Sequence, residues 1–183
     1  MGNVRGLVAL TVLIVVAACS ASASPIKVGG TSVTYTGSPP AECTPTEVAE
    51  AVRAFLDAFN RGDQQALRQI FQRSVIFSAQ NPPPIGFFLS SGQPSLLDYF
   101  SQRHAHGEAL ELTALQIQYG EGSSEAGLAP TISRRSDDLP PGVVTAKAAL
   151  DCNDRAIVVW NQGGPEASSE PTQRATRLEE ADW

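Results

Sequence analysis

Positive charge, aromatic residues and cysteine are all scarce in this sequence. Lys and Arg number 13 against 19 Asp and Glu over 183 residues, which gives a net charge of −6 at pH 7. That balance argues against a general affinity for nucleic acid, whose phosphates attract basic surfaces. Aromatic residues make up only 7% of the chain, but hydrophobic residues reach 42%. The sequence therefore has material for one packed domain, and we expect no nucleic-acid partner.

Several catalytic and cofactor-binding motifs are also absent. There is no P-loop lysine and no G-x-S-x-G nucleophile elbow. Gly120-Glu121-Gly122 is followed by Glu125 where a dinucleotide-binding loop needs a third glycine. His104, His106 and Glu108 would face the same way only on a strand, whereas they follow a predicted helix. We therefore expect no metal site and no cofactor.

The longest uncharged run lies at the N-terminus and is too short to cross a membrane. Leu7–Ala18 contains 12 residues, whereas a transmembrane helix needs about 20. Arg5 precedes this run and small residues follow it, an order typical of a secretory signal. We therefore predict a signal peptide over residues 1–18 that is removed from the mature protein.

The end of this segment, Val16-Ala17-Ala18-Cys19, resembles the lipobox of bacterial lipoproteins. The resemblance implies that Cys19 is lipidated and becomes the new N-terminus. Acyl chains contribute about 0.8 kcal/mol per buried methylene, so they would anchor the protein on the extracytoplasmic side of a bacterial membrane. The alternative is ordinary secretion, with cleavage after the A-x-A site that ends at Ala23.

Two cysteines remain if Cys19 carries a lipid. Cys43 and Cys152 are then an even pair in a compartment that permits oxidation, and we predict a disulfide between them. The alternative is two unpaired thiols, because one sequence does not show whether the two residues are close.

Composition divides the chain into four parts, of which the signal peptide is the first. Residues 19–43 are rich in Ser, Ala, Thr, Gly and Pro, which favours a flexible tether. Two alternating runs around Gly29-Gly30 also fit a β-hairpin, which would need the main domain to pack on. Residues 44–162 form the predicted domain. Residues 163–183 lack apolar periodicity, which predicts a disordered tail.

The domain is predicted to begin with a helix. Thr44, Pro45 and Glu47 form a capping-box pattern, and apolar residues then recur at helical spacing as far as Phe59. The elements expected next are a short helix from Asp63, a strand over 75–79, an edge strand within 85–89, and a helix from Ser95 to near Gly107.

From residue 109 onward the apolar period changes to two, which predicts β-strands. They are expected within 109–119, 143–151 and 156–160, and a turn at Asn153-Asp154 joins the last two. Residues 120–142 are predicted to be a long polar connection in which 131–135 adds an outer strand. Helices followed by consecutive antiparallel strands make an α+β pattern.

The helix over 52–59, the Asn60-Arg61-Gly62-Asp63 corner and the strand from Val75 resemble the start of nuclear-transport-factor-2-like, or SnoaL-like, domains. The resemblance implies an α+β fold in which a cone-shaped, curved antiparallel sheet packs against about three helices from the N-terminal half. It implies little about function, because one fold hosts many sites.

Enzymes of that superfamily hold an Asp, His or Tyr inside an apolar cone. The residues that could form such a pocket here are mainly aromatic: Phe55, Phe59, Phe77, Tyr99, Phe100, His104, Tyr119 and Trp160. None of the polar members matches a catalytic pattern residue by residue, and aromatic residues on a helix face are also typical of a packed core. Asp57 faces away from the apolar side of its helix and is expected to be a solvated acid. We therefore predict no catalytic residue.

Three hypotheses for the function follow. The leading one is an exported, membrane-anchored lipoprotein whose non-catalytic domain binds a small apolar ligand or an envelope protein. The first alternative is a cone-pocket isomerase, cyclase or dehydratase acting on a lipid-like substrate, which needs Tyr99, His104 or Tyr119 buried and hydrogen-bonded in an open pocket. The second is an interaction module that forms a homodimer through its sheet, which needs a filled cone and an exposed apolar sheet face.

Overall fold

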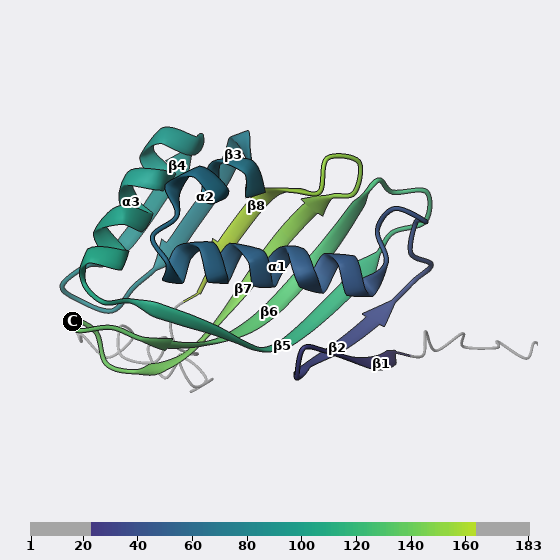
Figure 1. Cartoon of the computed structure of the whole chain (residues 1–183), viewed down its shortest axis with the longest axis horizontal. Coiled ribbons are helices and arrows are strands. Elements are labelled where there is room, and N and C mark those ends of the chain that lie inside the picture. The colour runs from purple at the N-terminus through teal and green to yellow at the C-terminus, as the bar shows by residue number, and fades with distance from the viewer. Residues whose placement is uncertain (1–22, 164–183) are drawn as a thin grey trace, which may run out of the picture.

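Residues 23–163 are described by a computed structural model of the chain. They form three helices and one eight-stranded sheet, which curls without closing (Figure 1). In chain order the elements are β1 (Ser24–Val28), β2 (Thr31–Thr36), α1 (Pro45–Asn60), α2 (Gln64–Ile70), β3 (Phe71–Gln80), β4 (Phe87–Ser91), α3 (Gln93–Ala105), β5 (Ala109–Tyr119), β6 (Glu125–Arg135), β7 (Gly142–Asp151) and β8 (Ala156–Gln162).

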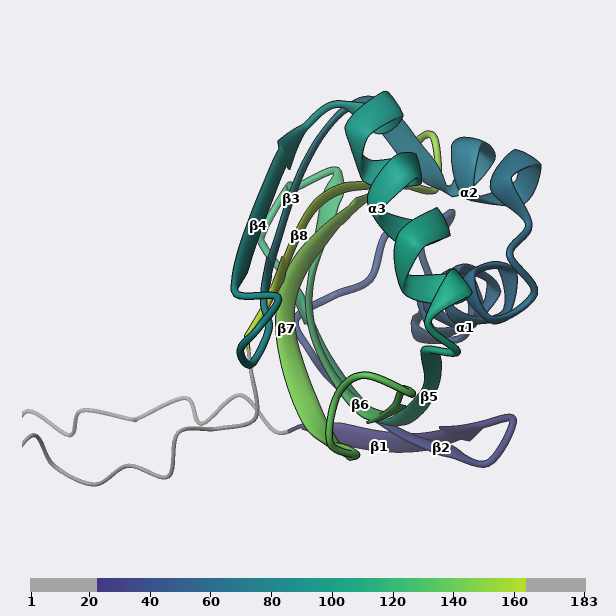
Figure 2. The same cartoon turned by 90° about the vertical axis from the view of Figure 1, so that its left-hand side faces the viewer.

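The sheet wraps around the helices. Its strand order is β1-β2-β5-β6-β7-β8-β3-β4, so β1 and β4 are the two edges. Neighbouring strands are antiparallel except for two parallel pairs, β2 with β5 and β3 with β8. Figure 2 shows the sheet bent into an arc with all three helices on its inner side. The predicted α+β fold with a curved sheet and three helices is confirmed.

The first helix starts and stops where its sequence predicts. The Thr44 hydroxyl accepts a hydrogen bond from the Glu47 amide, and the Glu47 carboxylate accepts one from the Thr44 amide at 3.0 Å, which completes the capping box. Gly62 then turns the chain at a φ of +65°, a conformation that favours glycine. Asp63 begins α2 by accepting a hydrogen bond from the Ala66 amide at 2.9 Å.

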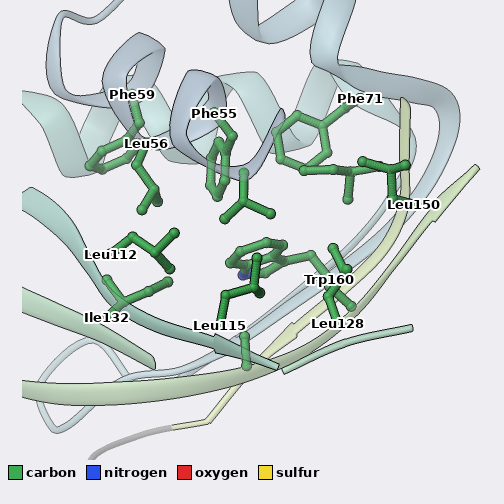
Figure 3. Packing of buried hydrophobic residues seen from close by; sticks show 14 of the residues in the cluster. Phe55, Leu56, Phe59, Phe71, Leu112, Leu115, Leu128, Ile132, Leu150 and Trp160 are labelled. Atoms are coloured by element: carbon green, nitrogen blue, oxygen red, sulfur yellow. The ribbon is translucent and has the colours of Figure 1, made fainter. Parts of the chain in front are cut away.

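The apolar face of α1 packs onto the inner face of the sheet. Phe55 and Phe59 are at most 2% exposed, and Trp160 from β8 lies below them with no exposed surface. Figure 3 shows Leu112, Leu115 and other inward side chains of the sheet rising to meet the helix. Burial of one such aromatic side chain stabilises the fold by about 2–3 kcal/mol.

The prediction for residues 120–142 is wrong. They contain β6, an 11-residue strand in the middle of the sheet, rather than a polar connection with an outer strand. Its inward positions include Ala126, Pro130 and Arg134, which weaken the apolar alternation that a strand prediction needs. Pro130 lies where the pairing of β6 with β7 is interrupted, because their register skips residues 129 and 130.

The expectation of a flexible tether over 19–43 is wrong for residues 24–36, which form the alternative β-hairpin, β1 and β2. The domain supplies the surface that the hairpin needs. Val33 is fully buried in the core, and β2 pairs in parallel with β5. Arg53 of α1 donates hydrogen bonds to the carbonyl oxygens of Val28 at 2.9 Å and Gly29 at 2.7 Å. The hairpin is thus held by both the helix and the sheet.

Two smaller boundaries also differ from prediction. The strand expected over 75–79 extends over the whole of β3, and α3 begins at Gln93 rather than at a Ser95 cap. Gly92 precedes α3 at a φ of +110°, and Pro94 occupies the first turn, where its missing N–H costs nothing.

The predicted disulfide is present. Cys43 and Cys152 are bonded with their Cα atoms 5.3 Å apart, across 109 residues of sequence. The bond joins the loop before α1 to the turn between β7 and β8, where Asn153-Asp154 lies as predicted. It therefore ties the start of the helical layer to a corner of the sheet.

The predicted signal peptide, Cys19 and nearly all of the predicted tail lie outside the described residues. Within residues 23–163, no helix has the length and apolar character needed to cross a membrane.

Replacing Cys43 and Cys152 together with Ser should lower the melting temperature by about 10 °C or more. A bond that closes a loop of this length contributes about 5 kcal/mol in the chain-entropy model, and each 1 kcal/mol corresponds to about 2–8 °C in domains of this order of size. Calorimetry with and without a reductant measures the effect. The reductant should lower the wild-type value and leave the double variant unchanged, and labelling of both thiols in the native protein would contradict the bond.

Candidate functional site

Most of the expected pocket residues form a filled core. The rings of Phe55 and Trp160 have centroids 4.9 Å apart, and those of Phe77 and Phe100 lie 5.2 Å apart in an edge-on arrangement. Phe59 packs on Phe100 at 5.5 Å. Edge-to-face contacts of this kind are typical of close-packed aromatic cores. The centre of the cone is therefore occupied by the protein's own side chains, as Figure 3 shows.

Tyr99 is buried, and its hydroxyl is hydrogen-bonded to another side chain. Asn81 donates to the hydroxyl oxygen at 3.1 Å, and the Tyr99 ring stacks on Phe88 with centroids 4.1 Å apart. Burial raises the pKa of Tyr99, because the phenolate would lose its hydration. The hydroxyl therefore stays protonated at neutral pH and accepts the hydrogen bond from the Asn81 side-chain amide.

Tyr119 is also buried, but at a different place. Its hydroxyl donates to the carbonyl oxygen of Cys43 at 2.8 Å, which fastens the end of β5 to the loop before α1. Burial, with smaller effects from Tyr35 and Glu47, raises the pKa of Tyr119 to about 12. A hydroxyl committed to a backbone carbonyl in this way has a structural role.

The two histidines lie at the surface. His104 is exposed and covers the corner at Gly62, where an added Cβ would lie 2.8 Å from its Nε2. His106 is also exposed, with its Nδ1 3.6 Å from a carboxylate oxygen of Asp138. Within residues 23–163, no three His, Cys, Asp or Glu side chains gather as metal ligands would.

A buried ion-pair network that the sequence did not predict fixes the C-terminal end of α3. Arg103 is 4% exposed, and its Nε donates to the buried Glu108 at 2.5 Å. Its two terminal nitrogens each donate to Asp138 at 2.8 Å, a bidentate pair that joins α3 to the loop after β6. The hydrogen bonds from Arg103 hold the pKa of Asp138 well below its usual range.

A large cavity lies beside the filled core rather than within it. It has a volume of about 1030 Å³ and is bounded by α1, the turn of the β1–β2 hairpin, the starts of β5 and β7, and the end of β6. Its apolar walls include Leu56, Leu110 and Leu112, and Asp57 is among its charged groups. None of the eight residues expected to form a pocket lines it. Asp57, expected to be a solvated acid, is exposed at this cavity.

Asn60 fixes one wall of this cavity. Its side-chain amide donates to the carbonyl oxygen of Leu110 and accepts from the Leu110 amide, both at 2.8 Å. Asn60 belongs to the predicted corner between α1 and α2. Its side chain makes the two backbone hydrogen bonds at Leu110 that a neighbouring strand would otherwise make with β5. The end of α1 and the start of β5 are consequently held at a fixed distance.

Arg134 of β6 is the most unusual residue of the cavity wall. It is 2% exposed, and its Nε and Nη1 atoms have no hydrogen-bond partner among the described residues. Sequence reasoning missed Arg134 because 131–135 was placed in an outer strand. The available signal was its spacing of two from Ile132, which puts both side chains on the same sheet face.

Comparisons with known proteins bear on the fold. No family model matches the sequence, and no curated protein does. A protein of unknown function with a cystatin-like fold from Nostoc punctiforme superposes with a TM-score of 0.54 at 16% identity, over 69% of this chain and 94% of its own. A candidate dehydratase of the nuclear-transport-factor-2-like family from Streptomyces avermitilis gives 0.52 at 17% identity, over 64% and 92%. The chain has the nuclear-transport-factor-2-like fold.

The same fold recurs in a larger pigment-binding protein. The canthaxanthin-binding orange carotenoid protein of an Anabaena species matches with a TM-score of 0.50 at 12% identity, over 61% of this chain and 34% of its own. Identities this low show that the nuclear-transport-factor-2-like fold is shared. They do not transfer the ligands or reactions of these proteins to this chain.

Asp138→Asn should make the stability of the domain less sensitive to acid. The pKa of Asp138 is lowered in the folded protein, so its stabilising effect is complete above the unfolded value, near 4, and is lost as the pH falls below it. The melting temperature measured at pH 6 and pH 3 should fall further in the wild type than in Asp138→Asn. The exposed neighbour provides a matched control, Asp137→Asn, which should behave like the wild type. Equal falls in wild type and Asp138→Asn would contradict the assignment.

Proposed function

We propose that this chain is an exported lipoprotein whose domain binds a small molecule in the cavity between α1 and the ends of β5, β6 and β7. The observation that carries the proposal is the cavity itself. Its volume of about 1030 Å³ is at the upper end of the range of small-molecule sites. Its walls combine three leucine side chains with five charged residues, so they are more polar than those of most such sites.

The mixture of apolar and charged residues in the cavity wall indicates which kind of ligand fits it. A purely apolar ligand would leave the buried guanidinium of Arg134 without a partner. A molecule with an apolar body and one polar end satisfies both kinds of wall. This proposal therefore departs from the wholly apolar ligand expected from the sequence.

Binding rather than catalysis is the activity that the polar groups support. Tyr99 and Tyr119 are buried and hydrogen-bonded, but their partners are an amide side chain and a backbone carbonyl, and neither residue lines the cavity. A general acid or base must reach the reacting atom at hydrogen-bond distance. His104, on the outer surface of the α1–α2 corner, is not among the cavity residues.

Export and anchoring are supported by two features. The Cys43–Cys152 disulfide fits an oxidising compartment outside the cytoplasm. Cys19 ends a lipobox-like sequence and would carry the acyl chains. The domain would then act at the surface of a bacterial membrane.

Native mass spectrometry of the full chain extracted from membranes should report acyl chains and a retained small molecule together. Gly142 lines the cavity, and an added Cβ there would meet nothing within 4 Å, so Gly142→Leu should fill space without a clash and abolish retention of the molecule. Gly163→Leu, at an exposed glycine away from the cavity, is the matched control and should retain it. Cys19→Ala should lose the acyl mass and leave the membrane fraction. Retention of the molecule by Gly142→Leu, or membrane binding by Cys19→Ala, would contradict the corresponding part of the proposal.

A second candidate function is self-association through the outer face of β3 and β4. Ile76, Phe87 and Leu89 are 49%, 63% and 62% exposed on these two strands. β4 is also an edge of the sheet, so one side of its backbone has no neighbouring strand within the described part of the chain. A filled cone with an exposed apolar sheet face is the combination that favours a homodimer, and the occupant that we propose for this face is a second copy of the chain.

Leu89→Asp should shift the protein from dimer to monomer, because it places a charge in the centre of that apolar face. Sedimentation equilibrium at micromolar concentrations measures the shift. Lys147→Asp changes an exposed residue on the outer side of β7 and should leave the oligomeric state unchanged. A wild type that stays monomeric at all concentrations would rule out self-association.

A further inference from the structure

Two buried side chains carry nitrogen atoms that no other group satisfies. Within residues 23–163, Arg134 has two fully buried nitrogens without a hydrogen-bond partner, and Trp160 has one. The Trp160 indole N–H lies in an aromatic core, where a single neutral donor is a modest cost. The Nε and Nη1 of Arg134 carry three N–H groups on a side chain that stays charged at any physiological pH.

The carboxylates of the buried ion-pair network are bound to a different arginine. Glu108 and Asp138 both contact Arg103. No carboxylate of the described residues comes within 4.0 Å of Arg134. A buried guanidinium without an acceptor is destabilising, so a structural role alone gives no reason for it.

The position next to Arg134 on the same sheet face has no side chain. Gly142 of β7 is the direct partner of Arg134 in the antiparallel pair, and directly opposed residues project to the same face. A Cβ on Gly142 would meet no atom within 4 Å. The partner on the other side, Leu110 of β5, is apolar. Arg134, Leu110 and Gly142 all belong to the cavity wall.

We propose that Arg134 binds the carboxylate of an organic monocarboxylate, whose apolar body lies against Leu56, Leu110 and Leu112. This inference rests on the proposed small-molecule site and names the chemical class of its ligand. A carboxylate supplies the missing acceptors for the buried N–H groups, and arginine binds such planar groups with charge-assisted hydrogen bonds.

The charges around the cavity favour a single negative charge. A phosphate monoester carries about −1.5 to −2 at neutral pH, more than one unpaired guanidinium neutralises. Asp57 and Glu111 also line the cavity and would repel the excess charge. Arg53, Arg134 and Arg135 set against these two carboxylates give the lining a net charge of about +1, which a monocarboxylate matches.

The experiment compares three probes with the same body: 4-phenylbutanoate, 4-phenylbutan-1-ol and 4-phenylbutyl phosphate. Each is titrated calorimetrically into the full chain in a neutral detergent, for the wild type, Arg134→Met and Arg73→Met. Arg73 is exposed on β3 and does not line the cavity, so its variant controls for loss of one positive charge. The wild type and Arg73→Met should bind the carboxylate about tenfold or more tightly than the alcohol, as expected for hydrogen bonds to a charged group. Arg134→Met should bind the two equally.

The melting temperature of each variant without probe separates a binding role from a structural one. Arg134→Met should match or exceed the wild type, because an apolar side chain replaces a buried charge without a partner. A lower melting temperature with unchanged preference for the carboxylate would overturn the proposal.

The remaining outcomes distinguish this inference from the proposed function. Equal binding of carboxylate and alcohol by the wild type would overturn the role of Arg134 and leave the small-molecule site standing. Tighter binding of the phosphate would overturn the choice of carboxylate. Failure of all three probes to bind would overturn both the inference and the site.

Discussion

The contact between Phe55 and Trp160 is the one on which the rest of the domain depends. Phe55 lies at the middle of the apolar face of α1, and Trp160 comes from β8 near the far end of the sheet. Their rings, with that of Phe71 5.0 Å from Phe55, fill the centre of the concave face. Because these large side chains occupy the middle, the cavity lies to one side, where Gly142 contributes no side chain. The cavity beside Gly142 is consequently a product of how the core is packed.

Side-chain and covalent ties at the ends of the layers keep this arrangement in place. The disulfide and the Tyr119 hydroxyl hold the start of α1 at one corner of the sheet. Asn60 holds its other end to β5, and Arg103 holds α3 to the loop after β6. The cavity lies close to the contacts made by Asn60 and Arg103. Its walls are therefore set by fixed backbone segments, which reduces the cost of ordering a site when a ligand binds.

The parts of the fold that were predictable from sequence are those with strong local signals. The helix α1 combines a capping box with an apolar stripe, and its boundaries follow from those residues alone. The strand β6 could not be placed, because Pro130 and Arg134 occupy inward positions and hide its alternation. The hairpin was recognised as an alternative, but its stability comes from β5 and Arg53, which are distant in sequence. Arg134 was missed for the same reason, since its burial depends on the neighbours that β6 gains in the sheet.

The hairpin at the edge of the sheet would also limit how far the domain could stand from a membrane if Cys19 carried the proposed acyl chains. Strand β1 begins at Ser24, five positions after Cys19, and a fully extended chain covers at most about 3.6 Å per residue. An acyl group on Cys19 would therefore keep the first strand within about 18 Å of the lipid surface. Such a short link restricts rotation as well as distance, so the domain would present a preferred side to the bilayer. Residues 24–36, which could have formed a long flexible linker, are instead strands of the folded domain.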